Sequence, residues 1–238
     1  MDPPLVARMR EELERNADPE IQESSQRFFK EGLLCYGMKT KTANDIGKKY
    51  WKEVKNHPKV EIYALCEELF SSGYQEEIQI ASNWTYALSG KYDRDDIFLF
   101  RHWIDTSITN WAACDTFCNH TVGDFMEHYP ECVEELRDWT QSENRWMRRA
   151  AAVSLIVPAK RGKFLEESIA IADLLLTDPD DLVQKGYGWL LKEVSREHTK
   201  EVFSYVMENK RRMPRTALRY AIELMPEELK AEAMQKDW

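Results

Sequence analysis

The chain has 238 residues, of which 43% are hydrophobic and 32% charged, and its formal net charge is −9. This composition is typical of a soluble globular protein, and we expect a single domain over residues 1–238. The charged segment 1–15 lacks an apolar run of signal-peptide length, and no later segment is apolar enough to span a membrane. We therefore expect a cytoplasmic protein without a membrane partner.

The five cysteines form an odd set with no Cys-x-x-Cys pair, which argues against a disulfide framework and against a common zinc site. Cys114, Cys118 and His120 could be drawn as a metal cluster, but their spacing matches no known motif. The cysteines are expected to pack as small hydrophobic side chains. We predict no metal ion and no cofactor.

Glycine and proline, at nine each, are scarce for a chain that needs many tight turns, and no segment alternates with strand period. A turn is expected at Gly37, followed by an N-cap at Thr42. Apolar residues at helical spacing predict helices at 5–14, 19–36, 42–55, 58–70, 78–88, 97–104, 110–129, 130–140, 144–157, 164–176, 181–196, 200–208, 214–224 and 226–235. We expect an all-α array of about fourteen helices stacked as antiparallel pairs.

Basic residues are concentrated in three islands, although the chain as a whole is acidic. Seven lysines lie in 39–59, six basic residues and no acid lie in 145–163, and five basic residues and no acid lie in 210–219. A net charge of −9 would by itself repel phosphate. Each island can be a solvated helix face, but three around one candidate site favour a polyanionic partner.

The segment 110–115 carries the first part of that candidate site. Trp111 and Asp115 stand four residues apart, so on a helix they share one face, with an aromatic ring one turn from a carboxylate. The alternative is that Asp115 is an ordinary solvated acid.

The segment 144–157 carries the second part. Arg145, Arg148 and Arg149 gather on the flank of its apolar face, with no acid at i±4. Like charges so placed repel each other unless an anion joins them, and guanidinium groups suit phosphate. We predict that these three arginines contact phosphate groups of the partner.

The segment 181–196 carries the third part. Trp189 lies off the apolar stripe and aligns with Lys185, Lys192 and Arg196. Neighbouring glycines lower helix propensity there, by about 1 kcal/mol each, and allow a backbone or ligand to approach closely. We predict a ligand against Trp189, with Lys185 and Lys192 as contacts to the polyanionic partner; the alternative is a neighbouring helix packed over the indole.

The spacing of the three parts indicates a repeat. Arg149 follows Trp111 by 38 positions and Trp189 follows Arg149 by 40, close to the period of paired-helix HEAT repeats. The three helices are then expected at equivalent places in successive repeats, presenting these residues along one concave surface.

Three motifs are specific when their order and spacing are taken together: Trp111-x-x-x-Asp115, Arg149 before two alanines, and Trp189 in Gln-Lys-x-x-Gly-Trp. With these motifs the chain resembles the AlkD-like DNA alkylation-repair glycosylases over nearly its whole length. The resemblance implies a right-handed solenoid of HEAT-like helix pairs that grips duplex DNA on its concave face and acts as a monomer. It implies excision of cationic N3-alkyladenine and N7-alkylguanine without flipping of the base into a pocket. By residue-wise transfer, Asp115 is the catalytic carboxylate, Trp111 and Trp189 are aromatic walls, and Arg149 is a backbone contact. The chain departs from the family at Asn110, Phe28 and Lys39, where a second Trp, a Tyr and a Gln are usual; we retain Lys39 as a DNA contact.

The chemistry agrees with the presence of one carboxylate. Glycoside hydrolysis generally needs a second carboxyl group as general acid, whereas a cationic base leaves as a neutral molecule without that help. Asp115 would stabilise the oxocarbenium-like sugar, and aromatic faces would add cation–π attraction. Two alternatives remain open, namely a non-catalytic repeat protein that binds branched or damaged DNA, and a HEAT-like scaffold that binds another protein.

Overall fold

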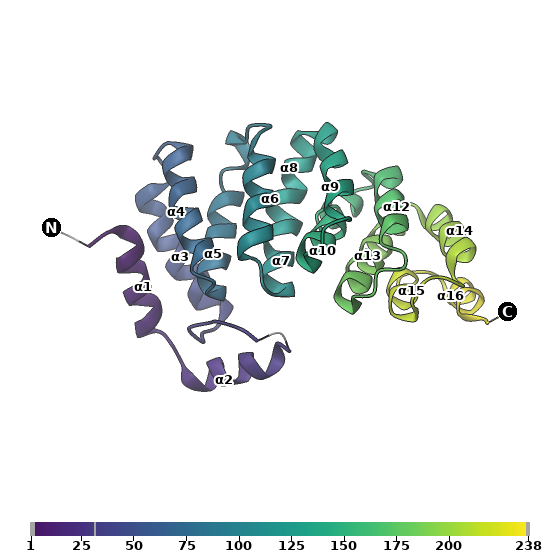
Figure 1. Cartoon of the computed structure of the whole chain (residues 1–238), viewed down its shortest axis with the longest axis horizontal. Coiled ribbons are helices and arrows are strands. Elements are labelled where there is room, and N and C mark those ends of the chain that lie inside the picture. Colours follow the sequence, from purple (N-terminus) through teal and green to yellow (C-terminus); the bar gives the residue numbers. More distant parts are fainter. Residues whose placement is uncertain (1–2, 31, 237–238) are drawn as a thin grey trace. The chain divides into compact units, whose positions relative to one another are not determined.

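The computed structural model describes residues 3–30 and 32–236, and in these residues all regular secondary structure is helical (Figure 1). The α-helices are α1 (Leu5–Arg15), α2 (Pro19–Phe28), α3 (Thr40–Val54), α4 (Lys59–Ser71), α5 (Gln75–Tyr86), α6 (Asp96–Ser107), α7 (Trp111–Phe117), α8 (Gly123–His128), α9 (Val133–Trp139), α10 (Arg145–Val153), α11 (Ile156–Ala159), α12 (Leu165–Leu174), α13 (Asp181–Val194), α14 (Thr199–Asn209), α15 (Arg215–Ala221) and α16 (Glu227–Met234). Short 3₁₀ helices lie at η1 (Ser89–Lys91) and η3 (Pro130–Cys132), and η2 (Cys118–Val122) is π-helical. The predicted all-α class is confirmed.

The helix boundaries differ from the predicted ones in several places, and the single helix predicted at 144–157 is divided into α10 and α11. The helix predicted at 19–36 ends at Phe28, and the chain then runs irregularly to Lys39. Thr42 is not a cap, because α3 already begins at Thr40 with Lys39 in the N-cap position. The helix predicted at 110–129 is interrupted by the π-helical η2, which directly follows α7. No helix in the described part of the chain is long and apolar enough to cross a membrane.

The chain divides into two compact units, Met1–Phe117 and Cys118–Trp238. In the first unit α3, α5 and α7 pack in one row, while α4 packs on both α5 and α6 in a second row. In the second unit α10, α13 and α15 form one row, and α12 packs against α9, α10 and α13. Each unit is therefore a stack of helix pairs, as the sequence predicted. The single-domain interpretation stays a prediction.

The core of the first unit is aromatic and fixes α7. Phe70 of α4 stacks on Trp103 of α6 with ring centroids 4.7 Å apart. Phe117, the last residue of α7, meets Phe70 and Phe100 edge-on at 5.2 and 5.6 Å. All four rings are fully buried, and burying each contributes roughly 1.5–3 kcal/mol. Because Phe117 closes this cluster, the helix that carries Asp115 is anchored at its C-terminal end.

The irregular segment between α2 and α3 is held by buried acids of α5. The Glu76 carboxylate accepts the backbone N–H groups of Tyr36 and Gly37, each at 3.0 Å. Glu77 accepts the Tyr36 hydroxyl at 2.6 Å, and burial together with this hydrogen bond raises the pKa of Tyr36. Gly37 has a φ of 85°, and a Cβ there would lie 2.6 Å from the Asp18 carbonyl oxygen. Gly37 thus has the left-handed conformation that favours glycine, but the predicted turn is not formed there, because residues 32–39 run without an assigned turn or bend.

The core of the second unit centres on α13. Tyr187 is fully buried and its hydroxyl donates to the Leu176 carbonyl at 2.9 Å. Val183, Leu190 and Leu191 complete the buried stripe that the sequence predicted. All five cysteines of the chain are free and buried, which confirms that they pack as small hydrophobic side chains.

Candidate nucleic-acid site

Trp111 and Asp115 lie one turn apart on α7 in the first unit, and both side chains are half-buried. The helix begins there because Asn110 caps it: the Asn110 side-chain oxygen accepts the Ala113 N–H at 2.9 Å. The Asn110 amide also donates to the Gln75 side chain at 2.8 Å, which joins the start of α7 to the start of α5. This double role gives a structural reason for an asparagine directly before Trp111.

Two phenylalanines at the end of α2 surround Trp111. Phe29 stacks on the indole with centroids 5.4 Å apart and planes 19° apart, and Phe28 meets it edge-on at 6.1 Å. Phe28 remains 68% exposed. Because Phe29 covers one side of the Trp111 ring, the indole is held as a fixed aromatic wall beside the Asp115 turn. The sequence analysis missed the role of Phe29; two adjacent aromatics near a predicted helix end were the available signal.

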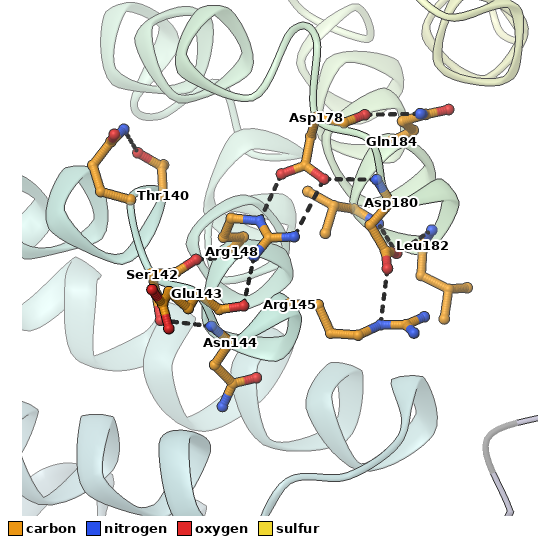
Figure 2. A network of polar contacts seen from close by, with 12 residues as sticks. Thr140, Ser142, Glu143, Asn144, Arg145, Arg148, Asp178, Asp180, Leu182 and Gln184 are labelled. Atoms are coloured by element: carbon orange, nitrogen blue, oxygen red, sulfur yellow. Dashed lines mark hydrogen bonds and ion pairs between the residues drawn. The ribbon is translucent and has the colours of Figure 1, made fainter.

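Two of the three predicted arginines of α10 are paired with aspartates that lie between α12 and α13 in the second unit (Figure 2). Arg148 Nε donates to Asp178 at 2.6 Å, and its Nη1 donates to the Ser142 and Glu143 carbonyls. Arg145 forms an ion pair with Asp180 at 3.1 Å. The expectation that only a bound anion would neutralise these arginines is therefore wrong, because acids distant in sequence do so.

Arg149 is buried and points into the α10–α13 contact. Its Nη1 donates to the Leu182 carbonyl in the first turn of α13, and only 5% of the residue is exposed. A Cβ on Gly186 would lie 3.4 Å from Arg149 Cγ, so the glycine leaves room for this side chain. The predicted close approach at Gly186 is made by a protein side chain. A phosphate contact by Arg149 stays a prediction.

Trp189 is half-buried on α13, off the apolar stripe as predicted. Its indole N–H donates to Glu193 at 3.3 Å, and Glu193 also accepts from Arg196, whose pKa this hydrogen bond raises. Gly188 faces α15: a Cβ there would lie 2.8 Å from Tyr220 Cβ and 2.9 Å from the Ala217 carbonyl oxygen. The second glycine is thus required by a neighbouring helix, while the side chain of Trp189 is oriented by Glu193.

The remaining predicted cations differ in their surroundings. Lys185 pairs with Asp181 at 2.9 Å within α13, and Lys192 pairs with Glu223 at 2.8 Å. Lys39 is exposed at the N-terminal end of α3. Trp111 and Asp115 lie on the same helix in the first unit, and the α10 arginines contact residues at or just before the start of α13 in the second unit. That all of them form one surface stays a prediction.

Comparison with known proteins decides the family. The family profile described as DNA alkylation repair enzyme matches residues 9–225. The chain belongs to this family. A search of the curated proteins found no match.

Among solved structures, a predicted DNA alkylation repair enzyme from Enterococcus faecalis is similar with a TM-score of 0.80 and 16% identity over 89% of this chain and 98% of the other. This likeness shows that the two share the fold. The Pseudomonas fluorescens alkylpurine DNA glycosylase AlkC, bound to DNA containing an abasic site analogue, is similar with a TM-score of 0.48 and 19% identity over 76% of this chain and 51% of the other.

Proposed function

We propose that this member of the DNA alkylation repair enzyme family is a DNA glycosylase. Its substrates are purines made cationic by alkylation, N3-alkyladenine and N7-alkylguanine in duplex DNA, and its reaction is hydrolysis of the N-glycosidic bond. The observation that carries the proposal is the arrangement on α7, where Asp115 lies one turn from Trp111 and Phe29 stacks on the Trp111 indole.

The chemistry assigned to Asp115 is electrostatic. As the glycosidic bond breaks, positive charge develops on the deoxyribose, and a fixed carboxylate lowers the energy of that oxocarbenium-like state. The same carboxylate orients the attacking water. Trp111 supports the cationic lesion nucleotide by cation–π attraction. Because an alkylated base leaves as a neutral molecule, the reaction proceeds without a general acid.

The second unit is assigned to DNA backbone recognition. Trp189, with its indole N–H held by Glu193, supplies an aromatic face against the sugar-phosphate. Lys185, Lys192 and the α10 arginines add positive charge, although the pairing of Lys185, Lys192, Arg145 and Arg148 with acids reduces its net effect. The lesion is read from outside the stack without base flipping, by a monomer.

The test is Asp115→Asn, assayed on duplex DNA carrying 7-methylguanine. The amide keeps the side-chain shape and removes the charge, so base release should fall roughly 100- to 1,000-fold. Duplex affinity and thermal stability should change little. Asp138→Asn, the same substitution at an exposed acid of α9, serves as the matched control and should excise normally.

Equal losses of binding and excision would make Asp115 structural. Undiminished excision in Asp115→Asn would remove it from the chemistry. If the wild type binds the duplex and releases no base, the chain is instead a non-catalytic repeat protein that recognises damaged DNA.

A further inference from the structure

The first unit contains a cavity of about 360 Å³ between α3 and α5. Its lining includes Asn44, Lys48 and Trp51 from α3, and Asn83, Trp84 and Ala87 from α5 and its C-terminal end. Neither Asp115 nor Trp111 contributes to it. Its size falls within the range of pockets that hold small molecules, and the lining combines aromatic rings with a few polar groups, as such pockets do.

Two tryptophans form the aromatic side of this cavity, which we name the α3–α5 pocket. Trp84 is buried and its indole N–H donates to the Gly47 carbonyl at 3.0 Å, so its ring is fixed. Trp51 lies against it with centroids 6.0 Å apart and planes 42° apart, and it remains partly exposed. A half-exposed indole backed by a fixed one offers a rigid face for another flat ring.

Two asparagines add hydrogen-bonding groups beside the rings. The Asn44 side-chain oxygen accepts from Gln79 and from Asn83, each at 2.9 Å. These bonds orient both amides. Within the described residues they leave the Asn44 NH₂ group and the Asn83 side-chain oxygen available to a ligand. A donor and an acceptor held together match the mixed edge of a nucleobase.

Lysines continue from the pocket along α3. Lys48 lines the pocket, and Lys52 and Lys55 follow it at i+4 and i+7 on the same side of the helix. All three are exposed, and none forms an ion pair with an acid among the described residues, although the Asp45 carboxylate attracts Lys48 electrostatically. By contrast, Lys41 pairs with Asp45 and Lys49 pairs with Glu12. A row of exposed ammonium groups suits a chain of phosphates.

We propose that the α3–α5 pocket holds an unpaired base of a DNA strand whose phosphates follow Lys48, Lys52 and Lys55. Stacking on Trp51 accepts any base, because every base has a π-face, and the lysines bind the backbone beside it. The proposal rests on the proposed function only in taking DNA as the partner. It assigns to the first unit a base-binding subsite formed by helices other than the one that carries Asp115.

The test compares a short oligothymidylate with an abasic strand of the same length and phosphate number. Wild-type protein should bind the base-bearing strand more tightly by about 5- to 150-fold, the range that base–aromatic stacking supports. Trp51→Ala should lose this preference and retain the affinity for the abasic strand, and Trp51→Phe should recover part of it. Ala87→Leu, at the exposed rim, should block the pocket and have the same effect without removing a core contact.

Lysine variants test the backbone path. Lys48→Gln should weaken binding to both strands. It should also reduce the slope of log affinity against log salt concentration by about 0.7, as for one lost phosphate contact on a single strand. Lys41→Gln is the matched control on the same helix, because its amine is already paired with Asp45, and it should bind as the wild type does.

Equal wild-type affinity for the two strands, or a preference that survives both Trp51→Ala and Ala87→Leu, would overturn the proposal. The binding assay involves no excision. Its failure would therefore leave the proposed glycosylase activity untouched, and loss of excision in Asp115→Asn would leave this pocket untouched.

Discussion

Arg148 of α10 is held by one aspartate and two backbone carbonyl groups, and its role in stability can be measured. It donates to Asp178 and to two carbonyls, and the paired side chains are only 16% and 6% exposed. Arg148→Met would leave the Asp178 carboxylate buried without its cation. We expect the free energy of unfolding to fall by about 3 kcal/mol in denaturant titration.

Lys185→Gln is the control for that measurement. Lys185 and Asp181 form an exposed i,i+4 pair on α13, so its loss should change stability by no more than about 0.5 kcal/mol. Restoring neutrality in Arg148→Met/Asp178→Asn should recover part of the lost stability. A single Arg148→Met variant as stable as the wild type would show that the ion pair has no structural role.

At the scale of single residues, the sequence predicted where a side chain lies on its helix or whether it is buried better than it predicted which residues pair with each other. The burial of the cysteines follows from their odd number and the lack of a Cys-x-x-Cys pair, and the position of Trp189 off the apolar stripe follows from spacing along one helix; both are confirmed. The aspartates that pair with Arg145 and Arg148 lie about a repeat further along the chain, 30 residues on in the case of Arg148. Pairing between elements depends on packing, which helical periodicity does not specify.

The two glycines of α13, Gly186 and Gly188, have different neighbours, so replacing each with alanine should change the stability in opposite directions. Alanine favours a helix by about 1 kcal/mol over glycine. At Gly186 the added Cβ would make ordinary contacts of 3.4 Å or more with Arg149 and Val153, so Gly186→Ala should be neutral or slightly stabilising. At Gly188 it would lie 2.9 Å from the Ala217 carbonyl oxygen and 2.8 Å from Tyr220 Cβ.

Because backbone cannot yield as a flexible side chain can, Gly188→Ala should lower the free energy of unfolding by about 1–3 kcal/mol. Thermal unfolding of the two variants in parallel gives the comparison. Equal effects at the two positions would contradict the close α13–α15 contact.

At the scale of elements, helices with a clear apolar stripe were predicted well. The segments 181–196 and 200–208 correspond to α13 and α14 within a few residues. The segment 19–36 was predicted as one helix because its apolar residues continue past Phe28, yet buried Glu76 binds the backbone at Tyr36 and Gly37 and holds the chain in another conformation. A carboxylate supplied by a helix 40 residues away leaves no signal in local periodicity.

For the whole molecule, the net charge of −9 hides how its charges are distributed. The basic residues of α10 and α13 are largely paired with acids within their unit, while Lys48 and Lys52 of α3 and Lys55 at its C-terminal end form no ion pair with an acid among the described residues. The sequence located the islands but could not distinguish these two situations. It also predicts that Trp111, Arg149 and Trp189 lie on successive repeat helices, which stays a prediction, and the family match agrees with the proposed repair function.

The proposed mechanism makes leaving-group charge the main determinant of substrate choice. One carboxylate without a general acid lowers the barrier only where the base departs neutral. We therefore expect release of 3-methyladenine and 7-methylguanine from duplex DNA, and no release of uracil, hypoxanthine or 8-oxoguanine. Chromatographic detection of free base from matched duplexes measures this, with Asp115→Asn as the blank. Efficient excision of a neutral lesion would contradict the single-carboxylate mechanism.

Lesion size should matter less than charge under the same mechanism. An enzyme that flips its substrate must fit the whole base into a cavity, whereas one that reads the sugar and phosphate from outside the stack imposes no such limit. A bulky cationic N7-alkylguanine should therefore be released at a rate within about tenfold of 7-methylguanine, a difference of roughly 1.4 kcal/mol in the barrier. A neutral base of ordinary size in the same sequence context separates the effect of charge from that of bulk. Rejection of the bulky cation alongside rapid release of the methylated base would show that the lesion enters an enclosed pocket, and would exclude excision without base flipping.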